Sequence, residues 1–127
     1  MFKAKGASRK EIGDQAEALA LAHLERQGLS LVQRNYRVAR GPSARGGEVD
    51  LILRDRDGTL VFVEVRARAD GRFGGAAASI GHVKRQRIIH AAQYYLLRLA
   101  TLPPCRFDVV TVDAGRIEWL PGAFDAG

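Results

Sequence analysis

Asp50 and Glu64 are the residues of this 127-residue chain whose types and spacing are best suited to chemistry. Each lies in a β-rich run, residues 48–54 for the aspartate and 59–68 for the glutamate, and a short hairpin between the runs would set the two side chains opposite each other. Two ionised carboxylates with side-chain roots about 5 Å apart repel each other unless a positive charge lies between them. Because Mg²⁺ prefers oxygen ligands, the pair predicts half of a divalent-cation site that leaves room for a phosphodiester.

The register of this hairpin follows from its turn. A three-residue loop, residues 56–58, with Gly58 in the left-handed position fixes the pairs counted outward from it. They are Asp55 with Thr59, Ile52 with Phe62, Asp50 with Glu64, and Glu48 with Arg66. The opposite face then carries only apolar side chains and suits a covering helix; it consists of Val49, Leu51, Leu53, Val61, Val63, Val65 and Ala67. A shift of one residue would set Glu64 on that apolar face, which favours the stated pairing.

The polar face of the hairpin also has a purely structural interpretation. On the solvent side of an antiparallel pair, polar residues alternate with apolar ones for no catalytic reason. Glu48, Asp50, Glu64 and Arg66 would then form salt bridges only. Short patterns of this kind arise by chance, so spacing alone does not exclude that interpretation.

The elements before the hairpin are a helix and a strand. Ser8 and Glu11 have the spacing of a capping box, and apolar residues recur at helical intervals until Gly28, a natural stop. These residues are Ile12, Ala16, Leu19, Ala20 and Leu24. Residues 29–38 mix β-branched, aromatic and polar types, which predicts a strand in the outer part of the sheet.

The elements after the hairpin are a helix and two strands. Ser79 is the predicted N-cap of the helix, which ends before Pro103, and its apolar stripe consists of Ile80, Val83, Ile88, Ala91, Ala92, Tyr95, Leu96 and Leu99. Residues 105–112 form a strand and residues 116–120 a shorter final one. A right-handed crossover through the helix sets two strands parallel. The prediction is an α/β fold of order α-β-β-β-α-β-β, a mixed central sheet flanked by helices, in one domain of residues 8–120 with loose ends at 1–7 and 121–127.

The composition favours a nucleic-acid partner. Twenty Lys and Arg against fourteen Asp and Glu give a net charge of +6, and the basic residues predicted to flank the acidic pair could follow phosphates. They are Arg40, Arg45, Arg66, Arg68, Arg72, Lys84, Arg85 and Arg87. No base-reading motif is visible, which indicates recognition of shape. A single cysteine, Cys105, and the lack of a long apolar segment favour a cytoplasmic protein without a membrane partner.

Several short motifs fall in one order along the chain. They are Gly13-Asp14-Gln15-Ala16-Glu17, Asn35, Gly47-Glu48-Val49-Asp50-Leu51-Ile52, Val61-Phe62-Val63-Glu64-Val65-Arg66, Ser79-Ile80, Lys84 and Arg106-Phe107-Asp108-Val109-Val110. Over residues 11–120 this series resembles the uncharacterised YraN-like bacterial family, which is similar to archaeal Holliday junction resolvases within the PD-(D/E)XK nuclease superfamily. The resemblance implies a restriction-endonuclease-like fold.

The same resemblance implies residue roles. Asp50 and Glu64 would bind Mg²⁺ or Mn²⁺, the Val65 backbone carbonyl would complete the coordination, and Glu17 would match the acidic residue that resolvase-like members bring from the first helix. Judged from the residues alone, Glu17 could equally be a solvated helix residue.

The chain departs from the superfamily pattern at two positions. Arg66 stands where a lysine is usual, and a guanidinium that stays protonated can hold a phosphate but cannot act as general base. The proton acceptor would then be a metal-bound water, Glu48 or the substrate, and Lys84 is a possible substitute for the lysine. The superfamily proline is replaced by Val49, which matters little because the strand directs Asp50.

Three functions remain open at this point. The first is a Mg²⁺- or Mn²⁺-dependent endonuclease that hydrolyses phosphodiesters of branched or structured DNA through a metal-activated water. Such an enzyme could act as a homodimer, because resolving a junction takes two cuts. The second, favoured by Arg66, is a non-catalytic nucleic-acid-binding module on a nuclease scaffold. The third is an RNA-processing enzyme.

Overall fold

The elements of the chain follow the predicted order. The computed structural model describes residues 8–39, 46–68 and 80–126. Within these ranges the elements are α1 (Arg9–Arg26), β1 (Ser30–Val38), β2 (Gly47–Arg54), β3 (Leu60–Arg68), α2 (His82–Leu96), β4 (Cys105–Asp113) and β5 (Arg116–Phe124). None of the helices in the described part is long and apolar enough to cross a membrane.

The strands form one mixed sheet in the order β1-β2-β3-β4-β5. β3 and β4 are parallel, as expected for strands joined by a helical crossover, and the other neighbouring pairs are antiparallel. β1 is an edge strand, as predicted. The arrangement is α/β and consistent with the restriction-endonuclease-like fold.

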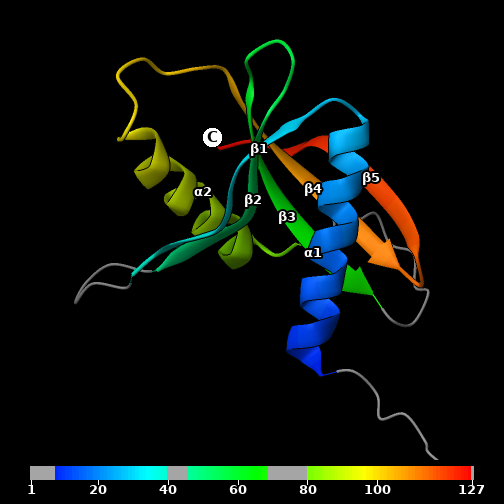
Figure 1. Ribbon diagram of the computed structural model, residues 1–127. Helices are drawn as coiled ribbons and strands as arrows, with labels where there is room; N and C mark the ends of the chain where they lie inside the picture. Colours follow the sequence, from blue (N-terminus) through cyan, green and yellow to red (C-terminus); the bar gives the residue numbers. More distant parts are fainter. Residues whose placement is uncertain (1–7, 40–45, 69–79, 127) are drawn as a thin grey trace, which may run out of the picture.

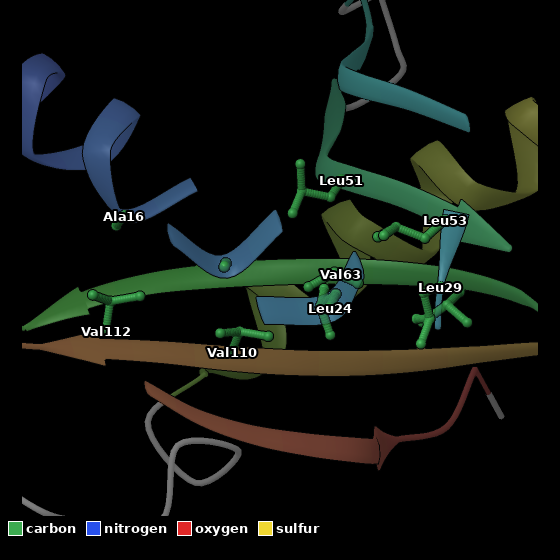
Figure 2. Close-up of a cluster of buried hydrophobic side chains, with 10 residues drawn as sticks. Ala16, Leu24, Leu29, Leu51, Leu53, Val63, Val110 and Val112 are labelled. Atoms are coloured by element: carbon green, nitrogen blue, oxygen red, sulfur yellow. The ribbon is translucent and has the colours of Figure 1, made fainter. Parts of the chain in front are cut away.

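The two helices cover opposite faces of the sheet (Figure 1). α1 buries Ala16, Ala20 and Leu24 against side chains of the central strands, a cluster that includes Leu51, Leu53, Val61, Val63, Val110 and Val112 (Figure 2). Ile12 and Leu19 were predicted in this stripe but are 39% and 44% exposed. Two of the three fully buried helix positions are alanines, so α1 rests on a narrow stripe that leaves its bulkier flanks in solvent.

α2 covers the face that carries Ile52 and Phe62. Both side chains are fully buried, although they alternate with the apolar set beneath α1. The interpretation of this face as a solvent face of the hairpin is therefore wrong. Val49 also packs in the α2 cluster, instead of on the same face as Leu51 and Leu53 as predicted.

The start of α2 and the end of β5 differ from the sequence-based expectation. Gly81 is the N-cap, and Ser79 lies outside the described residues. Val83 is 59% exposed, and Ile80 precedes the helix and packs against Val109. β5 continues beyond Leu120 through Phe124, because Gly122 adopts φ +61° at a register shift and the Phe124 ring stacks on Phe107.

The hairpin between β2 and β3 has the predicted turn and register. Gly58 adopts φ +91°, its backbone N–H donates to the Asp55 carbonyl at 3.0 Å, and the Asp55 N–H donates to the Thr59 carbonyl at 2.9 Å. Ile52 lies opposite Phe62. The described pairs run from Arg54 with Leu60 to Leu51 with Val63, so they end one residue before Asp50 and Glu64.

Candidate metal centre

The β2–β3 ladder opens at the acidic pair. Its last described rung joins Leu51 to Val63. The alternation of an antiparallel ladder would next bond the Val65 N–H to the Val49 carbonyl, but that N–H donates to Asp50 Oδ2 at 2.8 Å. The Asp50 side chain therefore replaces a backbone acceptor at the point where the strands separate. The predicted pairs of Asp50 with Glu64 and of Glu48 with Arg66 both lie beyond this rung and do not form part of the ladder.

Glu64 is buried without full hydrogen bonding. Its side chain is 4% exposed, and its Oε1 atom has no hydrogen-bond partner. Burial first, and the negative charge of Asp50 second, raise the pKa of Glu64 to about 8, although Lys84 and Arg66 act in the opposite direction. A hydrogen bond with Asp50, which requires a proton on one of the two carboxyl groups, favours the neutral form as well.

Lys84 and Arg66 lie near this pair, but each is at least 3.6 Å from the Glu64 carboxyl group. Lys84, in the first turn of α2, places Nζ 3.6 Å from Glu64 Oε2 and 3.5 Å from Glu48 Oε1. Arg66 Nη1 lies 3.9 Å from Glu64 Oε2. The side chains of Lys84, Glu48 and Arg66 are each 30% to 33% exposed, so this cluster reaches the surface beside the buried glutamate.

Glu17 faces the same region from α1. Burial raises the pKa of Glu17, the charge of Asp50 raises it as well, and a side-chain hydrogen bond from Asn35 lowers it. The interpretation of Glu17 as a fully solvated residue therefore does not hold. Asn35 has no predicted role, yet it adopts φ +50° in β1. Asparagine tolerates this conformation better than most residues, and that preference was the available signal.

The donor set fits a hard divalent cation. Two carboxyl groups share one site, one of their oxygens is buried without a partner, and both would carry charge if a cation replaced the shared proton. Within the described ranges, no group of three Asp, Glu, His or Cys side chains is close enough to hold a metal together. The predicted set of Asp50, Glu64 and Glu17 is therefore not gathered closely enough to hold a metal by itself.

The predicted basic surround is placed in part. Lys84 and Arg66 lie at the acidic pair, and Arg87 lines a pocket beside Glu48. Arg45, Arg40, Arg72 and the Arg68 side chain lie outside the described part of the chain. Sequence reasoning missed Arg37, whose Nε is 3.5 Å from Glu48 Oε2. No local signal distinguishes Arg37 from the other arginines, because its partner comes from the neighbouring strand.

Comparisons with known proteins find close relatives over nearly the whole chain. The family described as "Uncharacterised protein family UPF0102" matches residues 16–112. A UPF0102 protein of Methylibium petroleiphilum is 63% identical over 117 residues, covering 92% of this chain and 96% of that protein. UPF0102 proteins of Paracidovorax citrulli and Albidiferax ferrireducens are 59% and 56% identical and cover 96% and 98% of this chain, with 91% and 95% of their own lengths aligned. These matches confirm the resemblance to an uncharacterised bacterial family.

Proposed function

The chain belongs to the UPF0102 family, and we propose that it is a Mg²⁺- or Mn²⁺-dependent endonuclease that acts on structured or branched DNA. The observation that carries this proposal is the buried Glu64 oxygen without a partner, in a carboxyl group that faces Asp50. A buried polar group left unsatisfied costs free energy, and such costs concentrate at functional sites. A bound divalent cation would remove the cost.

The acidic residues would divide the work of holding the cation. Asp50 and Glu64 supply carboxylate oxygens from two strands, the Val65 carbonyl is a further proposed ligand, and Glu17 orients a water molecule with Asn35 fixing its carboxyl group. When bound, the ion would lower the pKa of the attacking water and stabilise charge on the phosphodiester. The strands hold these groups rigidly, which favours a fixed position of the reacting phosphate.

The cationic residues would handle the charge of the phosphate. Lys84 Nζ, within 3.6 Å of Glu64 Oε2, can donate to a non-bridging oxygen and supplies the ammonium group that Arg66 cannot. Arg66 can bind the same phosphate through its guanidinium. Glu48 is partly exposed beside Lys84 and can accept the proton released by the attacking water.

The proposed DNA partner rests on charge. A net charge of +6 attracts a polyanion, and the basic residues at the acidic pair suit contacts to phosphates instead of base edges. Recognition by shape fits a branched substrate. Because a four-way junction needs two cuts, we propose that two copies of the chain act together.

A cleavage panel tests the proposal. Wild-type protein is incubated with four-way junctions, nicked duplex, single-stranded DNA and RNA, with Mg²⁺, with Mn²⁺ and with chelator. We expect metal-dependent cleavage of the branched DNA and a loss of at least about 10³-fold in Asp50→Ala, comparable to the removal of a major electrostatic group. The matched control, Asp125→Ala, removes an exposed carboxylate near the end of the chain and should cleave normally.

Other outcomes of the panel separate the alternatives. Cleavage that persists in Asp50→Ala refutes the assignment of the site. If calorimetry detects no divalent binding while DNA binds with a steep salt dependence, the chain is a binding module. Cleavage of RNA but not of the matching DNA would indicate an RNA-processing enzyme.

A further inference from the structure

A pocket lies beside the candidate metal centre, where the ends of β1 and β2 meet α2. Its volume is about 410 Å³. The lining residues are Arg37, Val38, Ala39, Gly46, Gly47, Glu48 and Arg87. Glu48 belongs both to this lining and to the cluster with Lys84 and Glu64, so the pocket and the acidic pair share one wall.

Close packing of backbone shapes this pocket. A Cβ atom on Gly47 would lie 2.4 Å from the Arg87 carbonyl oxygen and 3.1 Å from the Ala91 nitrogen. Real Cβ atoms do not approach backbone so closely, which means that β2 contacts α2 directly because residue 47 is glycine. Gly46 and Gly47 therefore form a wall without side chains.

The charges in the pocket favour an anion. Its one carboxylate, Glu48, already has Arg37 Nε 3.5 Å from Oε2 and Lys84 Nζ 3.5 Å from Oε1. Arg87 Nε is buried and has no hydrogen-bond partner. The pocket is thus lined by two arginines and one carboxylate, and the charge of that carboxylate is shared between Arg37 and Lys84. Guanidinium donors match phosphate oxygens in geometry.

We propose that this pocket binds one unpaired nucleotide next to the scissile phosphodiester, with its phosphate held by Arg37 and Arg87. The volume is within the range of small-ligand pockets, and the shared Glu48 wall sets the bound nucleotide beside the metal centre. A paired nucleotide stays stacked in its duplex and cannot enter, so the pocket selects DNA with an unpaired nucleotide at the branch. The inference rests on the proposed nuclease function and names its substrate class.

Binding of a single nucleotide tests the pocket without any cleavage. The wild-type protein in chelator is titrated with deoxyadenosine 5′-monophosphate, deoxyadenosine and inorganic phosphate, followed by calorimetry and by backbone amide shifts. We expect shifts at Gly46 and Gly47, and affinity for the monophosphate about tenfold or more above that for the nucleoside and for phosphate. Equal binding of all three ligands, or shifts elsewhere only, would overturn the assignment.

Charge variants identify the residues responsible. Arg37→Ala changes a side chain that is 75% exposed and should keep the fold while weakening monophosphate binding about tenfold. Arg87→Ala should act in the same direction, and Arg87→Lys, with thermal unfolding as a check, keeps the test valid if the alanine variant is unstable. Arg26→Ala removes an exposed arginine from the last turn of α1 and serves as the control of equal charge. Unchanged binding in Arg37→Ala and Arg87→Lys refutes the proposal.

Cleavage then separates the pocket from the nuclease function. Two substrates are compared that differ by one unpaired nucleotide at the branch point. We expect wild type to prefer the unpaired substrate and Arg37→Ala to lose that preference. If wild type cleaves both substrates equally, the nuclease proposal stands and the pocket proposal is refuted. If the protein binds the nucleotide, loses that binding in the arginine variants and cleaves nothing, the pocket proposal stands and the nuclease proposal is refuted.

Discussion

Glu64 and Asp108 are buried carboxylates on neighbouring strands, and their surroundings are opposite. Asp108, fully buried in β4, accepts hydrogen bonds from Arg106 Nε at 3.0 Å, Trp119 Nε1 at 2.9 Å and the Gly122 N–H at 2.9 Å. Glu64 in β3 has an oxygen without a partner and cations no closer than 3.6 Å. A fully hydrogen-bonded buried carboxylate stabilises the fold. A buried carboxylate with an unpaired oxygen does not stabilise the fold in this way and calls for another explanation, such as a bound ion.

Hydrogen bonds around Asp108 connect three parts of the sheet. Arg106 also donates to Asp55 Oδ2 at 2.9 Å, which ties the β2–β3 turn to β4, and the bonds from Trp119 and Gly122 tie β5 to the same carboxylate. At the Glu64 end, the β2–β3 ladder is open and a side chain replaces a backbone acceptor. The carboxylate at one end of the sheet is therefore fully hydrogen-bonded, and the one at the other end is not.

Removing the carboxylate of Asp108 should give the largest change in stability. Asp108→Ala leaves the Arg106 side chain and two further donors without their acceptor, and we expect a loss of about 3–5 kcal/mol in the free energy of unfolding. Urea denaturation measures it. Glu118→Ala, an exposed change on β5, should stay within about 0.5 kcal/mol. A loss below about 1 kcal/mol in Asp108→Ala would remove the contrast between the two ends.

A divalent metal ion should stabilise the folded protein by binding at Asp50 and Glu64. At about pH 9, where Glu64 is ionised, Mg²⁺ or Mn²⁺ at about one hundred times its Kd should add about 2.7 kcal/mol to the free energy of unfolding. The stabilisation should vanish in Asp50→Asn and persist in Asp125→Ala. Thermal unfolding with and without chelator measures this, and equal stabilisation of Asp50→Asn would place the metal elsewhere.

The free energy of unfolding should decrease with rising pH because of Glu64. Its folded pKa of about 8 is above the ordinary 4.5, so in the metal-free protein its contribution to stability is full below the ordinary value and is lost as pH rises through the folded one. Relative to Glu64→Gln, wild type should lose stability across that window, by at least about 1 kcal/mol. Chemical denaturation of both proteins at several pH values measures the difference, and a gain for wild type with rising pH would contradict the raised pKa.

Asn35 should give the smallest effect. Asn35→Ala places alanine at φ +50° and should cost about 1 kcal/mol, and it removes the hydrogen bond to Glu17. Asn35→Gly removes the backbone strain at this positive φ but also lacks the hydrogen bond to Glu17. We therefore expect both variants to bind Mg²⁺ a few times more weakly, while only the alanine variant is less stable. Unchanged Mg²⁺ affinity in both would show that Asn35 does not position Glu17.

The parts of the fold that local chemistry determines could be predicted from sequence. Gly58 sets the turn, and the turn sets the register as far as Leu51 and Val63, so the proximity of Asp50 and Glu64 beyond that rung was accessible from the residues alone. The capping box of Ser8 and Glu11 likewise marked the start of α1. Each of these features depends on residues a few positions apart.

The features that escaped prediction depend on distant parts of the chain. The ladder ends after Leu51 because the Asp50 side chain takes the Val65 N–H, which a count of alternating residues cannot show. The contact of Gly47 with α2 and the pairing of Arg37 with Glu48 likewise require the packed sheet and helix. The sequence predicted the acidic residues with Lys84 and Arg66 beside them, whereas the role of Arg37 becomes apparent only in the packed structure.

Anomalous diffraction from a crystal soaked in Mn²⁺ at about pH 9, where Glu64 should be ionised, tests the central claim most directly. The account predicts one strong anomalous peak between the Asp50 and Glu64 carboxylates, with Mn–O distances of roughly 2.0–2.3 Å to both. It also predicts that the peak is absent from a soaked crystal of Asp50→Asn. An empty wild-type site with Mn²⁺ bound elsewhere, or a Glu64 carboxylate still paired only with Lys84 and Arg66, would contradict the account.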